Sequence, residues 1–174
     1  MQKTNNPSTQ GADWLDKATK LKEVVQAKLD SMPETQRTMA PSPGEWSASA
    51  VVEHLVLFEE NVVGPWRQKV LETPSAKAGI KSGLLSSMVS FVVSKTGIRV
   101  PTLLELEPKE VMGAEELGAR WDVARERLVA ALPDDTRSAW ILHPALGPLS
   151  SRQIGKLVAA HLEYHLRHWP APRG

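Results

Sequence analysis

Residues 150–169, SSRQIGKLVAAHLEYHLRHW, decide the fold prediction because they form one long helix with an inward-facing stripe. Ser150 and Gln153 match a capping box at its start, and Pro170 ends it. At about 1.5 Å per residue the helix is roughly 30 Å long. The stripe comprises Ile154, Leu157, Val158, His161, His165, His168 and Trp169.

Two of these histidines, His161 and His165, lie one helical turn apart, about 40° from each other around the axis. They occupy stripe positions that are apolar one turn earlier, so they point inward. His54 interrupts an apolar stripe on a second predicted helix. Any one of them, taken alone, is most simply a buried histidine bonded to a backbone carbonyl. Together they predict a divalent metal site made by His54, His161 and His165.

The spacing is not that of zinc proteases. Leu162 follows the first histidine, and Glu163 lies about 200° away on the outer face, so the motif supplies no general base. His168 lies near the helix end, where it is either a fourth ligand or a neighbouring or surface residue.

The remaining sequence predicts more helices. Apolar spacing indicates one helix over 13–32 and another over 115–132. A third helix begins at Ala48, and Gly64-Pro65 kinks or ends it, with a continuation over 66–71. Residues 134–148 are expected to form a loop, and 103–108 an extended connection. Residues 80–96 fit a further helix or a short strand. Residues 1–10 are expected to be disordered, and 11–174 to form one domain.

Composition narrows the function classes. The 174-residue chain has 41% hydrophobic residues, 24% charged residues and a formal net charge of +1, which argues against a nucleic-acid partner. Without cysteine, a metal must be bound by nitrogen and oxygen. No segment has the length and apolarity of a membrane span, and the N-terminus does not resemble a signal peptide, so a cytoplasmic location is expected.

Four principal helices, each with an apolar stripe, predict an all-α four-helix bundle. A helical or irregular insertion between the second and third helices would form the crossover connection. Three histidines with an open coordination position are typical of a catalytic metal site. The alternative is a non-catalytic binding or sensor protein whose metal site is closed.

Several short motifs, in order, resemble the DinB-like family, also called DinB/YfiT metalloenzymes. They are Trp46-Ser47 before Glu53-His54-Leu55, then His143-Pro144 with the segment GPLS at 147–150, and finally His161-x-x-x-His165. The helix over 117–132, with Trp121 and Arg125, lies in the expected place between them.

The resemblance implies an up-down-down-up bundle, a zinc or nickel ion on His54, His161 and His165, and a homodimer. Family members often have Gln at the position of His168. It also implies a small-molecule substrate, with characterised relatives including S-transferases and isomerases that use thiols such as mycothiol or bacillithiol. Hydrolase labels in the family rest on analogy. A metal-dependent, thiol-using enzyme is therefore the leading hypothesis.

Four further residues are candidate components of the site. Asn61 lies two turns after His54 and could orient a ligand or cap the surface. Tyr164 and Arg125 could bind substrate, although a packed tyrosine and a solvated arginine are the simpler interpretations. His143 could cover the mouth of the site or stabilise its turn.

Overall fold

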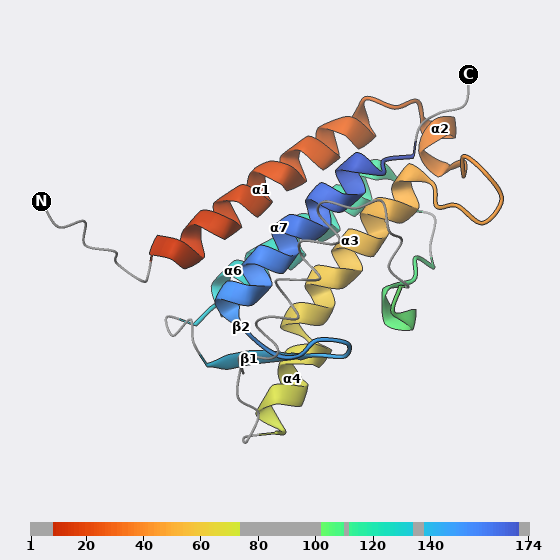
Figure 1. The fold of residues 1–174 in the computed structure, drawn as a ribbon. Coiled ribbons are helices and arrows are strands. Elements are labelled where there is room, and N and C mark those ends of the chain that lie inside the picture. The colour runs from red at the N-terminus through yellow and green to blue at the C-terminus, as the bar shows by residue number, and fades with distance from the viewer. Residues whose placement is uncertain (1–8, 74–101, 110–111, 134–137, 171–174) are drawn as a thin grey trace, which may run out of the picture.

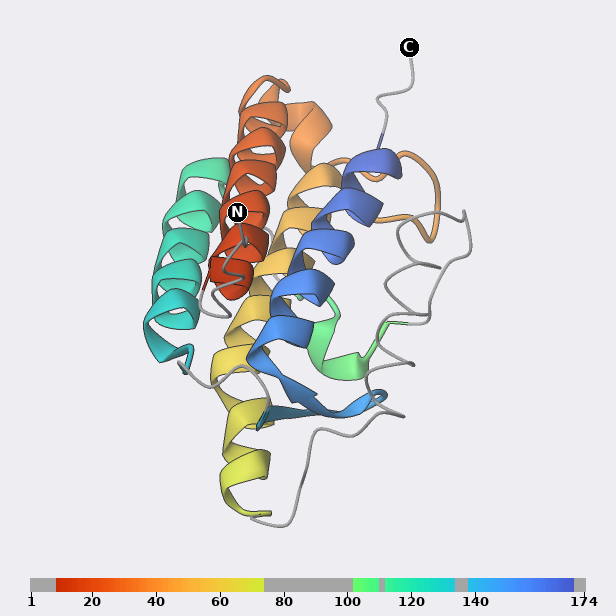
Figure 2. The ribbon, with the colours of Figure 1, turned by 60° about the vertical axis from the view of Figure 1, so that its left-hand side comes forward.

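The computed structural model describes residues 9–73, 102–109, 112–133 and 138–170. Within these ranges the protein is mostly helical, and its four long helices lie side by side (Figures 1 and 2). They are α1 (Thr9–Asp30), α3 (Ala48–Val63), α6 (Ala114–Ala131) and α7 (Ser151–Arg167). Among the described residues, no helix is long and apolar enough to cross a membrane.

The long helices form because their apolar residues recur on one face, and α3 and α7 also begin at side-chain N-caps. On α1, Ala18, Val25 and Leu29 are fully buried, as the predicted stripe requires. Ser47 caps α3 by accepting a hydrogen bond from Ala50 N at 3.2 Å. The capping box of α7 is confirmed: Ser150 N donates to Gln153 Oε1 at 2.8 Å, and Ser150 Oγ accepts from Gln153 N at 3.5 Å.

The helices pack as two close pairs, α1 against α7 and α3 against α6, with further contacts between the pairs. Gly155 allows α1 and α7 to approach closely, because a Cβ at this position would lie 3.3 Å from Trp14 Cβ. The core between the helices includes the fully buried Trp66 and Trp121. The predicted break at Gly64 is confirmed, and α4 (Pro65–Leu71) continues beyond it.

The prediction of a loop over 134–148 was wrong for its second half. Strands β1 (Ala139–His143) and β2 (Gly147–Ser150) form an antiparallel hairpin, so the chain is not purely α-helical. Gly147 opens β2 with φ +73°, a conformation that favours glycine. Ile141 and Leu149 pair across the hairpin and are fully buried. Packing against α4 and the core stabilises two strands that would be marginal alone.

Smaller differences concern element ends and connections. Thr9 and Gln10, expected to be disordered, belong to α1, while residues 1–8 lie outside the described residues. A short helix, α2 (Glu34–Thr38), follows Pro33 and was not predicted. A 3-10 turn, η1 (Leu104–Leu106), interrupts the expected extended connection. The predicted helix or strand over 80–96 lies outside the described residues.

Candidate metal centre

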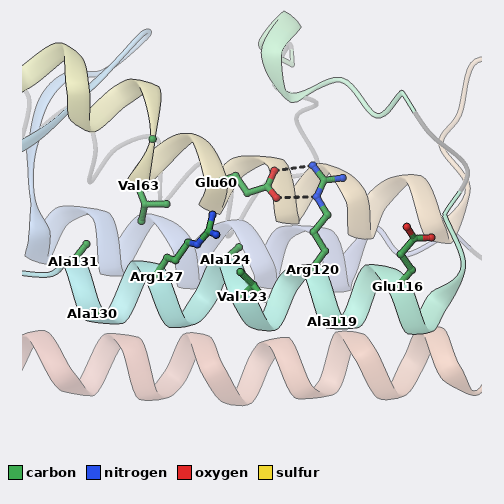
Figure 3. Close-up of a pocket in the computed structure, with 11 residues that line it drawn as sticks. Glu60, Val63, Glu116, Ala119, Arg120, Val123, Ala124, Arg127, Ala130 and Ala131 are labelled. Carbon is green, nitrogen blue, oxygen red and sulfur yellow. Dashed lines mark hydrogen bonds and ion pairs between the residues drawn. The ribbon is translucent and has the colours of Figure 1, made fainter.

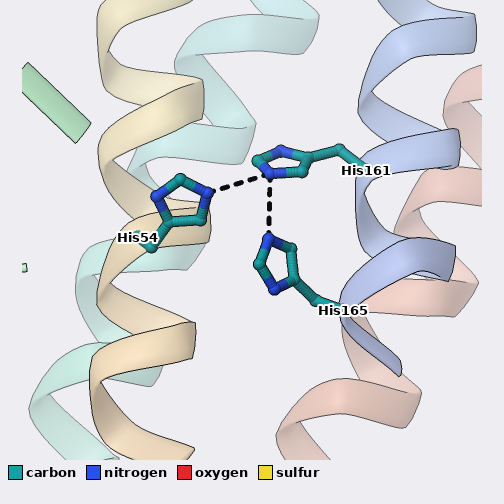
Figure 4. Close-up of side chains that lie close together, drawn as sticks. All are labelled: His54, His161 and His165. Atoms are coloured by element: carbon teal, nitrogen blue, oxygen red, sulfur yellow. Dashed lines mark hydrogen bonds between the residues drawn. The ribbon is translucent and has the colours of Figure 1, made fainter. Parts of the chain in front are cut away.

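The side chains of His54, His161 and His165 meet between α3 and α7 (Figure 4). His54 Nε2 lies 2.9 Å from His161 Nε2, and His165 Nε2 lies 3.1 Å from that same atom. One ligand atom from each of the three residues lies within 4.8 Å of the other two. The structure thus brings together the three histidines that the sequence singled out.

The 102–109 segment, which contains η1, fixes the orientation of the His54 ring. His54 Nδ1 lies 2.8 Å from the carbonyl oxygen of Leu106. A carbonyl can only accept, so Nδ1 must carry the hydrogen and donate it. In the neutral imidazole, Nε2 then carries a lone pair that faces the other two histidines.

His161 Nε2 has two nitrogen neighbours, but a neutral ring nitrogen has either one hydrogen or one lone pair. The single hydrogen or lone pair of His161 Nε2 can thus make only one full two-centre hydrogen bond to its two neighbours. A metal ion uses lone pairs alone. Nitrogens that share an ion at about 2.0–2.1 Å are at most about 4.2 Å apart. The two separations from His161 Nε2, 2.9 and 3.1 Å, lie within this limit, and the set of three ligand atoms lies within 4.8 Å. The donor set fits a divalent transition metal.

Aromatic rings surround the three imidazoles. Trp46 lies 4.9 Å from His54, Phe58 lies 4.6 Å from His161, and Tyr164 lies 5.1 Å from His165, measured between ring centroids. These rings offer little polar surface to a charged imidazole. His54 and His165 are 4% and 8% exposed, and His161 is partly buried, so the centre is enclosed at His54 and His165 and nearest to solvent at His161.

Burial lowers the pKa of all three histidines. Burial is the main cause at His54, where the hydrogen bond to Leu106 opposes it. The pKa of His161 lies well below 6.5, through burial and then repulsion from His165, His54 and His143. Burial, followed by repulsion from His54 and His168, lowers the pKa of His165 to about 3. The imidazoles are therefore neutral at pH 7, the form that binds a metal.

A family model of the DinB superfamily matches residues 19–168, which include all three histidines. The chain belongs to the DinB superfamily. This match confirms the family resemblance inferred from the short motifs. No curated protein and no solved structure matched the chain.

In this DinB-superfamily protein, the histidine that directly follows α7 lies apart from the centre. His168 is exposed and ends the helix, and its Nδ1 donates to Tyr164 O at 2.9 Å. The Tyr164 ring contacts both His165 and His168, at centroid distances of 5.1 and 4.4 Å. Tyr164 is thus the predicted substrate residue that lies beside the centre. Glu163 pairs with Lys17 of α1 at 2.6 Å, away from the histidines.

Two predicted residues have other partners. Asn61 donates through Nδ2 to Leu57 O at 2.8 Å, a contact within its own helix. Arg125 is 6% exposed and donates to both carboxylate oxygens of Glu59, through Nε at 2.8 Å and Nη2 at 2.5 Å. Its Nη1 donates to Thr19 Oγ1 at 3.2 Å. The guanidinium connects α6 to α3 and α1, in place of the solvated position favoured from the sequence.

His143 shapes the hairpin turn. Its Nδ1 accepts hydrogen bonds from Ala145 N at 3.1 Å and Leu146 N at 3.2 Å. The ring packs against Trp66 at a centroid distance of 4.5 Å. Burial lowers the pKa of His143 to about 4, against the attraction of Glu105. These contacts support the turn-stabilising interpretation of this residue.

A separate groove of about 950 Å³ lies along α6 beside the end of α3 (Figure 3). Alanine, valine and glycine line much of it, and an ion pair between Arg120 and Glu60 crosses its wall, with N–O distances of 2.8 and 2.7 Å. None of the three histidines lines this groove.

Sequence reasoning missed the contacts that support the centre. The acceptor for His54 is the Leu106 backbone carbonyl, which no side-chain pattern reveals. Glu53 was noted only as part of a motif, yet it is buried and accepts from Lys109 N at 3.2 Å. Its place in an otherwise apolar stretch of α3 was the available signal.

Proposed function

We propose that this protein is a metal-dependent enzyme whose divalent ion, zinc or nickel, is bound by His54, His161 and His165. The observation that carries the proposal is the convergence of three Nε2 atoms, with His54 Nδ1 held as a donor by Leu106 O. A ring nitrogen bound to a backbone carbonyl is the usual support of a histidine ligand. Membership of the DinB superfamily agrees with a metal site.

When bound, the ion supplies a Lewis acid with an open position, available to a water or a substrate thiolate. The three neutral imidazoles bring no negative charge to compensate it. A small anionic group is therefore the favoured occupant of the open position. Phe58 and Trp46 lower the local dielectric and strengthen that preference.

Among thiol-dependent transfer and hydrolysis, we favour transfer of a small electrophile to a low-molecular-weight thiol. Glu163 pairs with Lys17 rather than facing the histidines, so the motif does not bring a carboxylate base to a water. Tyr164, in contact with His165, is the proposed substrate-contacting residue.

A non-catalytic metal-binding or sensor protein is the second candidate, and the coordination number separates the two. A closed structural site needs a fourth ligand. The cluster of metal-ligating side chains found among the described residues contains three members, and His168 is turned to Tyr164 O. This supports a centre with an exchangeable position.

The proposal is tested by elemental analysis of protein purified without a metal-affinity tag. We expect close to one transition-metal ion per chain, a loss of that ion in His161→Ala, and its retention in the control His168→Ala. The proposal is overturned if wild type and His161→Ala are equally metal-free and equally stable after zinc or nickel is added. A panel of mycothiol, bacillithiol, glutathione and coenzyme A then identifies the thiol by metal-dependent turnover.

We also propose that residues 11–174 form one domain, an up-down-down-up bundle of the four long helices. In Figure 2 the chain runs upward in α1 and α7 and downward in α3 and α6, which supports this order. We further propose that the protein is a cytoplasmic homodimer without a nucleic-acid or membrane partner. Light scattering coupled to gel filtration measures the oligomeric state directly.

A further inference from the structure

We propose that Glu53 is a positioning residue for the histidine centre. In this proposal its carboxylate holds the 102–109 segment in place, so that the Leu106 carbonyl can fix the ring of His54. The inference rests on the proposed metal site, because its consequence is tighter metal binding by His54. Glu53 is therefore proposed to act on the ion through the Leu106 carbonyl and His54.

Two consecutive residues of α3 bind the same stretch of chain. His54 Nδ1 donates to Leu106 O at 2.8 Å, and Glu53 Oε1 accepts from Lys109 N at 3.2 Å. The two contact points are three residues apart along the segment. Two contacts from neighbouring residues restrict how the segment can turn, so they limit the direction of the Leu106 carbonyl relative to α3.

The segment has two further attachments. The Leu106 side chain is 4% exposed and belongs to the core, which fixes the depth of the 3-10 turn. Trp66 Nε1 donates to Glu105 Oε1 at 3.1 Å. Burial of a leucine side chain is non-directional, whereas hydrogen bonds set the orientation of the backbone. The contact from Glu53 therefore bears on where the carbonyl points.

Burial of the Glu53 carboxylate costs free energy, so its position in the core needs a physical explanation. The residue is 2% exposed, and a buried carboxylate loses strong hydration. Valine or leucine would suit the surrounding stretch, since Val51, Val52, Leu55 and Val56 are all buried there. A carboxylate offers what these residues lack, an acceptor for the Lys109 amide.

The role predicts different effects for two substitutions. Glu53→Gln keeps an acceptor oxygen for Lys109 N–H, while Glu53→Ala removes it. Loss of a group that orients a metal ligand costs about 10–100-fold in metal affinity. We expect Glu53→Ala to weaken Co²⁺ and Zn²⁺ binding by that amount, measured by competition with a chromophoric chelator, and Glu53→Gln to stay close to wild type.

Glu59 provides the matched control. It lies on the same helix, is 1% exposed, and binds Arg125 and Trp121 of α6 rather than the 102–109 segment. Glu59→Ala should lower the free energy of unfolding while leaving the Co²⁺ visible spectrum of the folded protein unchanged. Glu53→Ala should alter that spectrum, because the His54 ring changes its orientation at the ion.

A second measurement needs no metal. Nitrogen-15 NMR of the histidine side chains should show His54 as the single Nδ1–H tautomer in wild type and Glu53→Gln, and as a tautomer mixture in Glu53→Ala. The Lys109 amide should exchange slowly with solvent in the first two proteins and fast in the third.

The outcomes separate the inference from the proposed function. If wild type binds no metal but Glu53→Ala changes the His54 tautomer, the positioning role stands and the metal enzyme does not. If wild type binds metal and Glu53→Ala leaves affinity, spectrum and tautomer unchanged, the positioning role is overturned and the metal site stands. Equal loss of affinity in Glu53→Gln and Glu53→Ala also contradicts it, since the acceptor alone should suffice.

Discussion

At the scale of single residues, burial decides the charge state of the histidines. The imidazoles of His54, His161 and His165 sit among aromatic rings and one another, and each pKa is lowered chiefly by burial. A protonated ring there would lose hydration and repel its neighbours. The metal-free protein therefore has three neutral rings whose lone pairs are available without loss of a proton.

This charge state predicts an acid-sensitive fold. His165 has a pKa near 6.5 when unfolded and about 3 when folded. Between these values the unfolded chain binds the additional proton, so the free energy of unfolding of the metal-free protein falls as pH drops from 6.5 toward 3. Urea unfolding at pH 7, 6, 5 and 4 measures it. His165→Gln should show a shallower decline, and identical declines in both proteins would contradict the prediction.

A second residue-scale contrast lies between two arginines of α6 that bind glutamates of α3. The Arg125–Glu59 pair has side chains 7% and 2% exposed, and the Arg120–Glu60 pair has side chains 28% and 34% exposed. Removal of one partner from a buried pair leaves an uncompensated charge. Partly exposed pairs are screened by water.

We expect Arg125→Met to lower the free energy of unfolding by about 3–5 kcal/mol and Arg120→Met by less than about 1 kcal/mol. Urea unfolding at pH 7 compares them. Similar values for the two variants would show that burial does not govern these pairs. Activity lost in Arg125→Met without a loss of stability would instead favour the substrate-binding interpretation of Arg125.

At the scale of elements, the hairpin and the cap together set where α7 begins. Strand β2 ends at Ser150, which is also the N-cap of the helix. His161 and His165 follow at fixed positions on the helix, so their register relative to α3 depends on this junction. The Nδ1 of His143 binds two amides of the hairpin turn and stabilises the same unit.

Ser150→Ala removes the acceptor for Gln153 N–H, and loss of such a cap typically costs about 1 kcal/mol. We expect a lower unfolding midpoint in urea with an unchanged slope. Ser150→Asp is the control, because aspartate is also a good N-cap and should restore most of the loss. A variant as stable as wild type would mean that the capping box contributes little here.

At the scale of the whole molecule, the centre connects two helices far apart in the chain. His54 and His161 are 107 residues apart in sequence and belong to different helix pairs. A ligand bound by both is bound only by the folded protein. Its binding free energy therefore adds to the free energy of unfolding.

We expect zinc at 100 times its dissociation constant to stabilise the protein by about 2.7 kcal/mol. Thermal unfolding with zinc and with excess chelator measures the difference. His161→Ala should show no shift, and His168→Ala should shift like wild type. A metal-induced shift of equal size in His161→Ala would place the responsible site elsewhere in the protein.

The sequence by itself determined the features that depend on local spacing. Helices α1, α3, α6 and α7 follow from apolar periodicity and caps, and His161 and His165 are neighbours in any helix because they are four residues apart. The inward direction of His54 followed in the same way. Short elements are harder to predict from the sequence. Helix α2 has five residues and none is buried, so no apolar pattern marks it.

Only the tertiary structure decided what meets across the fold. Packing of α3 near α7 brought His54 Nε2 to 2.9 Å from His161 Nε2. Packing of the 102–109 segment on α3 brought the Leu106 carbonyl to Nδ1 of the same ring. Packing against α4 accompanies a hairpin where the second half of the expected 134–148 loop lies. Packing of α3 against α6 gave Arg125 a buried carboxylate partner, Glu59. Backbone acceptors and contacts across a hundred residues leave no periodic trace in the sequence, because they arise from the relative positions of whole elements.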